Sequence, residues 1–221
     1  MNPLVALFRR ELALAWGRGG GPANTLAFYV GTAVLLPLAV GDEPKRLAAV
    51  SAGAAFAALA LSSLLSLERM FERDFEDGGL DLLVLAGPSL SAASAGKALA
   101  QWVANGLPLA LASPVIAAML GASWTLAPVI VLSALLAGLA MTFIGGAGAA
   151  LALGARRGGL LLVVIVLPLY APPVILGSGA VEALGSGLPW TSPLLFLAAY
   201  ALAAVALTPF AMAAACRNAV G

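Results

Sequence analysis

The sequence predicts an all-α integral membrane protein with six transmembrane helices. Of its 221 residues, 62% are hydrophobic and only 10% are charged, and the mean hydropathy is +1.04. Soluble domains have roughly 45–50% apolar and about 25% charged residues. A soluble chain of this size could not bury so much apolar sequence without exposing large patches, so the bilayer is the expected solvent for most of it.

Six apolar stretches have about the length that crosses a bilayer, roughly 20 residues. Short charged or glycine- and proline-rich segments separate them. We therefore expect a single membrane domain over residues 1–221. Its transmembrane helices are predicted at residues 24–40, 47–67, 97–120, 125–153, 159–178 and 192–216.

The basic residues predict the orientation. With six spans, nine Lys and Arg residues fall on one side of the membrane and only Lys45 and Arg46 fall on the other. This is the positive-inside pattern of cytoplasmic loops. An even number of spans places both termini on that side, so we expect a multi-pass protein with cytoplasmic termini. The Ala- and Gly-rich composition favours a bacterial inner membrane, with a plant mitochondrial membrane as the alternative.

Residues 3–16 are expected to form an amphipathic helix that lies on the membrane. Arg9 and Arg10 occupy one face of this helix, and the large apolar residues recur at helical spacing on another. These apolar residues are Val5, Phe8, Leu12 and Trp16.

Several classes of function are excluded by what the sequence lacks. The chain has no histidine, one cysteine and a net charge of +1, which argues against metal-dependent catalysis and nucleic-acid binding. No phosphate-binding loop or nucleophile motif is present. We therefore expect no enzyme activity, no firmly bound cofactor and no metal site.

The predicted spans contain no Asp, Glu or Arg, and Lys97 lies at a cytoplasmic edge, where its stem is expected to snorkel to water. Transport driven by intramembrane carboxylates is therefore disfavoured, and the energy would come from a partner. Glycines of the fourth span are expected to serve close helix packing. Prolines at 168, 172 and 173 predict a distortion of the fifth span.

A few polar residues lie at membrane depth, and two interpretations of them stay open. Gln101 and Asn105 share one face of the third span beside Trp102, and Tyr170 lies in the fifth span. They could form interhelical hydrogen bonds, as in a scaffold, or line a transport path. A path would require several polar side chains to face one cavity, namely Gln101, Asn105, Tyr170, Ser62 and Ser66.

Residues 68–88 follow the second span on the predicted cytoplasmic side. Residues 68–81 contain six acids and two arginines, a local charge of −4. The spacing of charges and aromatics predicts a helix that continues out of the second span and ends at Gly78, followed by an apolar turn over 80–85. A solvated loop has no need of two phenylalanines and several leucines, so we expect a docking surface for a cytoplasmic partner. Its contact residues are predicted to be Glu68, Arg69, Phe71, Arg73, Asp74, Phe75, Glu76, Asp77, Gly78, Leu80 and Asp81.

The stretch 61–81, LSSLLSLERMFERDFEDGGLD, resembles the most recognisable segment of the cytochrome c maturation haem exporter protein B family (CcmB). Further similar segments follow in order along nearly the whole chain. They are NGLPLALASP at 105–114, RRGGL at 156–160, VLPL at 166–169 and TPFAMAAA at 208–215.

The resemblance implies the membrane domain of an ABC-2 type exporter, with an N-terminal elbow helix and a cytoplasmic coupling helix. It implies two copies of this chain with two ABC ATPase subunits, a haem-handling membrane protein, a small helper and a periplasmic haem chaperone. ATP would be hydrolysed in the partner, and residues 68–81 would be the contact with it. Haem would be the transported species, with Gln101, Trp102, Asn105 and Tyr170 as candidates for its path.

The function implied is that of a permease subunit for c-type cytochrome biogenesis. It would couple ATP hydrolysis in a partner to haem export or delivery, or to release of the haem-loaded chaperone. Two alternatives stay open: a membrane scaffold that transports nothing, and an ABC-2 exporter of another amphipathic compound.

Overall fold

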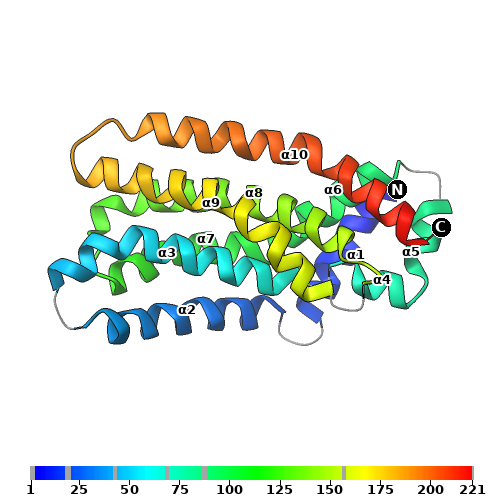
Figure 1. Ribbon diagram of the computed structural model, residues 1–221, viewed down its shortest axis with the longest axis horizontal. Helices are drawn as coiled ribbons and strands as arrows, with labels where there is room; N and C mark the ends of the chain where they lie inside the picture. The colour runs from blue at the N-terminus through cyan, green and yellow to red at the C-terminus, as the bar shows by residue number, and fades with distance from the viewer. Residues whose placement is uncertain are drawn as a thin grey trace.

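The computed structural model is an elongated bundle of helices (Figure 1). It describes residues 3–17, 21–41, 44–67, 70–85, 89–155 and 158–220. Within these ranges every regular element is a helix and there is no strand, which confirms the all-α class.

The first part of the described chain, up to Met119, contains both long and short helices. They are α1 (Pro3–Gly17), α2 (Gly21–Val40), α3 (Pro44–Leu67), α4 (Glu72–Glu76), α5 (Gly79–Leu85), α6 (Leu90–Gln101), the π-helix η1 (Trp102–Gly106) and α7 (Leu107–Met119). The second half contains the 3₁₀ turn η2 (Trp124–Leu126), α8 (Ala127–Leu151), α9 (Gly158–Gly185) and α10 (Thr191–Val220).

Six helical rods among the described residues are long and apolar enough to cross a membrane, which confirms the predicted number. Five of them are α2, α3, α8, α9 and α10, and the sixth is the continuous rod formed by α6, η1 and α7. This rod begins at Leu90, before the predicted start of the third span at residue 97. The Ser89 side chain explains the earlier start, because it caps α6 by accepting a hydrogen bond from the backbone N–H of Ala92.

Both termini lie at the same end of the bundle as α1, α4 and α5 (Figure 1). The connections from α2 to α3, from α7 to α8 and from α9 to α10 lie at the opposite end. The two ends therefore differ in character, since among the described residues the short helices α4 and α5 lie at the end with the termini.

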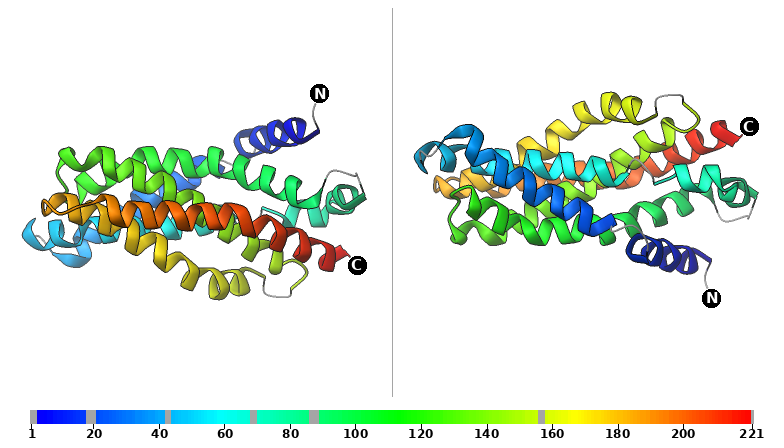
Figure 2. Two further views of the ribbon diagram at one scale, coloured as in Figure 1. Left: turned by 90° about the horizontal axis from the view of Figure 1, so that it is seen from above. Right: turned by 90° about the horizontal axis from the view of Figure 1, so that it is seen from below.

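The helix α1 lies outside the bundle beside α6 (Figure 2). Val5 and Trp16 of the predicted apolar face are 48% and 64% exposed, so these side chains point away from the bundle. Phe8 and Leu12, the other two residues predicted for this face, are half-buried. The exposed part of the face is available to lipid, as for a helix that rests on a membrane.

The acidic helix predicted to continue out of the second span is separated from that span. Met70 and Phe71 form a turn, so α4 is a separate short helix rather than an extension of α3. Gly78, with φ of +70°, follows α4 as predicted, because this left-handed conformation favours glycine. The apolar turn predicted over 80–85 is instead part of α5, and Leu80 anchors this helix with only 1% of its surface exposed.

The helix α8 lies at the centre of the bundle. In the most apolar 18-residue stretch of this span, 61% of the residues are buried. The corresponding stretches of the spans formed by α2, α9 and α10 are each 22% buried. Small residues allow its neighbours to approach: a Cβ at Gly145 would lie 2.3 Å from Leu67 Cδ1, and one at Gly148 would lie 2.2 Å from Val166 Cγ2. Helices in lipid associate largely through such close packing.

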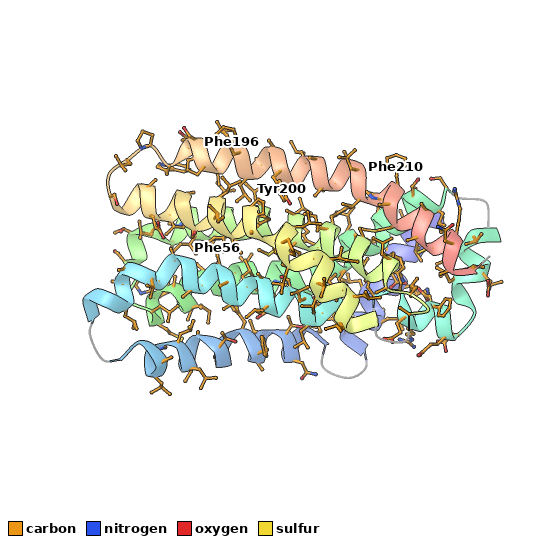
Figure 3. All side chains as sticks on the ribbon, in the orientation of Figure 1. Phe56, Phe196, Tyr200 and Phe210 are labelled. Carbon is orange, nitrogen blue, oxygen red and sulfur yellow. The ribbon has the colours of Figure 1, made fainter. Side chains whose placement is uncertain are left out.

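The helix α9 runs unbroken through its three prolines but is bent, with its Gly158 end splayed away from the bundle (Figure 2). Pro173 has no N–H to donate to the carbonyl of Leu169. The hydroxyl of Tyr200, which lies between α10 and α9 (Figure 3), donates to that carbonyl instead at 2.8 Å. A neighbouring helix thus satisfies a backbone group that water cannot reach in a bilayer.

The outer face of α10 is apolar. Phe196 and Phe210 point away from the bundle (Figure 3), and each is 67% exposed. Aromatic side chains exposed on this scale are disfavoured in water but suit contact with lipid.

Two glycines of α9 offer a matched test of this packing. A Cβ at Gly177 would lie 2.3 Å from Phe56 Cε1, whereas one at Gly179 would meet no atom within 4 Å. We expect Gly177→Ala to lower the free energy of unfolding by about 1–3 kcal/mol through overpacking. Gly179→Ala should be neutral or slightly stabilising. Thermal unfolding in mild detergent measures both, and equal effects would contradict the packing described for α9.

Candidate functional site

A polar cavity of about 950 Å³ lies where α1, α2, α3, α4 and α6 meet. The helices α1 and α4, which contribute to its lining, lie at the end of the bundle that holds both termini (Figure 1). The volume of the cavity is in the range of small-molecule sites. Four carboxylates and two basic groups are among its lining side chains. They are Glu11, Glu72, Asp74, Glu76, Arg73 and Lys97.

A row of polar side chains runs along one face of α6 and η1. Lys97, Gln101 and Asn105 are four residues apart, which places them on the same side of a helix. All three line the cavity. The segment that carries Asn105 is a π-helix, a form that often marks functional positions within longer helices.

The two amides of this row connect α6 and η1 to other helices. Gln101 Nε2 donates to the carbonyl oxygen of Ser66 at 2.6 Å. Ser66 lies in the last turn of α3, where carbonyls lack a partner within the helix. Asn105 Oδ1 lies 3.3 Å from Thr25 Oγ1 of α2. The row therefore joins the third membrane-spanning rod to the two before it.

Lys97, the basic residue of this row, belongs to a closed arrangement of four charged side chains, which we call the ion ring. Its members are Arg10, Glu11, Asp74 and Lys97. Lys97 Nζ lies 3.0 Å from Glu11 Oε2 and contacts Asp74 Oδ2. Arg10 lies 3.2 Å from Asp74 Oδ1 and 3.1 Å from Glu11 Oε1. Each cation thus touches both carboxylates, and the ring joins α1, α4 and α6.

The ion ring is buried at one side and open at the other. The side chains of Lys97 and Asp74 are only 3% and 6% exposed, whereas Arg10 is 50% exposed. Buried charges are tolerated when opposite charges and hydrogen bonds compensate them. The prediction that Lys97 snorkels to water is therefore wrong, because two carboxylates neutralise its ammonium group within the protein. The Phe71 ring also lies 5.6 Å from Lys97 Nζ.

The predicted partner-contact residues fall into three groups. Phe71, Asp74 and Leu80 are buried within this chain, and Phe75 and Gly78 are half-buried. Glu68 and Arg69 lie outside the described residues. The exposed members are Arg73, Glu76, Asp77 and Asp81.

The predicted path residues also divide. Gln101 and Asn105 line the cavity together with Ser66. Tyr170 is instead buried between helices, where its hydroxyl donates to the carbonyl of Met141 at 2.8 Å. Ser62 donates to the carbonyl of Ala58 in its own helix. The structure therefore brings together three of the five polar side chains that a path would require.

Trp102 packs against small residues of its neighbourhood. A Cβ at Gly106 would lie 2.6 Å from Trp102 Cδ1, and one at Gly138 would lie 3.7 Å from Trp102 Nε1. Across the described ranges, this Nε1 has no hydrogen-bond partner. The same ranges contain no group of three His, Cys, Asp or Glu residues that could hold a metal ion.

Comparison with known families identifies the family of this chain. The family model for the CcmB protein matches residues 2–219, almost the entire chain. The chain belongs to the CcmB family. This confirms the resemblance drawn from residues 61–81 and the later segments.

Individual CcmB-family relatives match over nearly their whole length. Heme exporter protein B of Pseudomonas aeruginosa is 44% identical over 220 residues, which cover 100% of this chain and 99% of the relative. The Paracoccus denitrificans protein of the same name is 47% identical over 214 residues, covering 97% and 98%. The Escherichia coli K12 protein is 39% identical over 211 residues, covering 96% of each.

Sequence reasoning missed part of the site in this CcmB-family chain. Glu11 and Arg10 belong to the predicted elbow helix, yet they pair with residues 64 or more positions away in the sequence. No pattern in the sequence marks Thr25, which lies within the first predicted span. A signal existed for Lys97, since it is the one charge within the predicted spans and therefore required a partner.

Proposed function

We propose that this CcmB-family chain is the permease subunit of an ATP-driven complex for c-type cytochrome biogenesis. The relatives that match it over their full length are named heme exporter protein B. Haem is accordingly the proposed transported species, and this chain holds no cofactor firmly. ATP is bound and hydrolysed in a separate ABC ATPase subunit.

One observation carries the proposal: the short acidic helix α4 lines the same cavity as the amides of Gln101 and Asn105. A helix that can meet a cytoplasmic partner is thereby in contact with a space that reaches between the spans. Movement of α4 would change the shape of that cavity. This is the arrangement that coupling of ATP hydrolysis to transport requires.

The complex would contain two copies of this chain and two ATPase subunits, together with a haem-handling membrane protein and a small helper. A periplasmic haem chaperone would receive the haem or be released by the cycle. The positive-inside bias supports an orientation in which the end with both termini faces the cytoplasm of a bacterium. In that orientation α4 and α5 face the ATPase.

The ATPase contact would use the exposed charges of α4 and of the turn that follows it. The side chain of Asp77 is 72% exposed and that of Arg73 is 52% exposed, and their ion pair of 3.8 Å lies at the surface. Leu82 of α5 is 68% exposed and adds an apolar contact. Asp74 and Phe71 would act from the interior by holding α4 in place.

The cavity would form the cytoplasmic side of a path for an amphipathic molecule. Gln101 and Asn105 offer amide groups that bind carboxylate or carbonyl groups without adding net charge. A scaffold remains the second candidate, because Tyr170 and Ser62 form hydrogen bonds within the bundle. An ABC-2 exporter of another amphipathic compound would share the path but accept a different cargo.

Reversal of one exposed charge tests the ATPase contact. We expect Asp77→Lys to weaken co-purification with the pathway's ATPase by about tenfold, because the contact depends on electrostatic complementarity. Glu182→Lys is the matched control, since this exposed carboxylate lies in α9 near the opposite end of the bundle. Equal loss in both variants, or a wild-type chain that never binds an ATPase, would contradict the proposal.

Substitution of the cavity amides distinguishes transport from scaffolding. We expect Gln101→Leu/Asn105→Leu to lower the yield of haem-loaded cytochrome c by about tenfold, with ATPase association unchanged, since buried polar groups determine specificity. Tyr170→Phe, which removes a hydrogen bond outside the cavity, should leave that yield near the wild-type value. An undiminished yield in the double variant, at equal membrane content, would support the scaffold.

A further inference from the structure

The helix α4 is attached to the bundle by one buried charge and by two aromatic side chains. Phe71, just before the helix, is 1% exposed, and Phe75 packs half-buried against the core. The one buried residue of α4 is Asp74, which points into the ion ring. The cavity of about 950 Å³ lies on one side of α4, and a second cavity of about 340 Å³ lies between α4 and the facing ends of α8 and α9. Free space on two sides of a five-residue helix is a condition under which a segment can move.

The connectivity of the ion ring gives each cation a second partner. Asp74 is the member that α4 supplies, whereas Glu11 belongs to α1. If Asp74 withdraws, Lys97 still contacts Glu11 at 3.0 Å and Arg10 still contacts Glu11 at 3.1 Å. Loss of a sole partner would leave an uncompensated buried charge, which is strongly unfavourable. Because Glu11 remains beside it, Lys97 does not become an uncompensated buried charge when Asp74 withdraws.

We infer that the ion ring is a two-position latch, in which α4 is docked when Asp74 joins Lys97 and is released when Glu11 alone neutralises Lys97. The inference rests on the proposed function, in which α4 meets the ATPase. Movement of the ATPase withdraws Asp74, and Glu11 keeps the ammonium group paired in the released position. Glu11 is thus a positioning residue for the coupling helix.

The latch also connects α4 to the polar row of α6 and η1. Lys97 lies on the same helix face as Gln101 and Asn105, and α4 contributes four lining residues to the cavity wall. Release of α4 removes that wall while the row stays in place. Opening of the cavity therefore follows release of the latch, and its closure follows the return of Asp74.

The test measures the distance between α1 and α4 in the complex with the ATPase. Spin labels are placed at Ala13→Cys and Glu72→Cys, two exposed positions, in a Cys216→Ala background that removes the one native cysteine. Distance distributions are recorded without nucleotide and after trapping with ATP and vanadate. The labelled chain is compared with Glu11→Gln, which keeps the size of the side chain but removes its charge. Glu182→Gln is the matched control outside the ring.

We expect trapping to lengthen the distance in the labelled chain and in the Glu182→Gln control. In Glu11→Gln the released fraction should fall by on the order of tenfold, because release would leave the buried ammonium group unpaired. Asp74→Asn should show the longer distance without nucleotide.

Two results would overturn the latch: a distance unchanged by trapping in the labelled chain, or an equal released fraction in the labelled chain and in Glu11→Gln. Either can occur while the chain still binds its ATPase, and the proposed function then survives without the latch. Failure of the labelled chain to bind an ATPase would instead remove the proposed function.

Discussion

The buried ammonium group of Lys97 is the constraint on which the functional end of the molecule depends. A cation at 3% exposure requires opposite charge at hydrogen-bond distance. The carboxylates that meet this requirement come from α1 and α4, so the ion ring links both helices to α6. Neutralisation of the Lys97 ammonium group thus contributes to the positions of the elbow helix and the acidic helix relative to α6, and both helices line the polar cavity.

The rest of the bundle provides a rigid frame for this end. Glycines of α8 allow side chains such as Leu67 and Val166 to approach within distances that any Cβ would prevent. Where proline removes a backbone donor in α9, the hydroxyl of Tyr200 satisfies the carbonyl of Leu169. Close packing and satisfied backbone groups hold the helices together in lipid. The contrast with α4, which has cavities on two sides, indicates where movement can occur.

The fold class, the number of membrane-spanning rods and the family could be predicted from the sequence. The length of each apolar stretch and the similarity of short segments to a family are local properties of the chain. The sequence was also sufficient to place Gln101 and Asn105 on one face, since their spacing determines this. It could not show that Tyr170 packs away from that face, because the rotation of α9 depends on its neighbours. Nor could it pair Glu11 with Lys97, since no local pattern relates positions so far apart. The burial of Asp74, predicted as a surface contact, follows from its own pairing with Lys97 and Arg10.

The most direct measurement is a double-mutant cycle on the free energy of unfolding with Lys97→Met and Asp74→Asn, in mild detergent. A buried pair that fixes α4 should give a coupling energy of about 1–3 kcal/mol. The same cycle on the exposed pair Arg73 and Asp77, with Arg73→Met and Asp77→Asn, should give less than about 1 kcal/mol. A coupling energy near zero for Lys97 and Asp74, or one no larger than that of the exposed pair, would contradict the dependence of this end of the molecule on the ion ring.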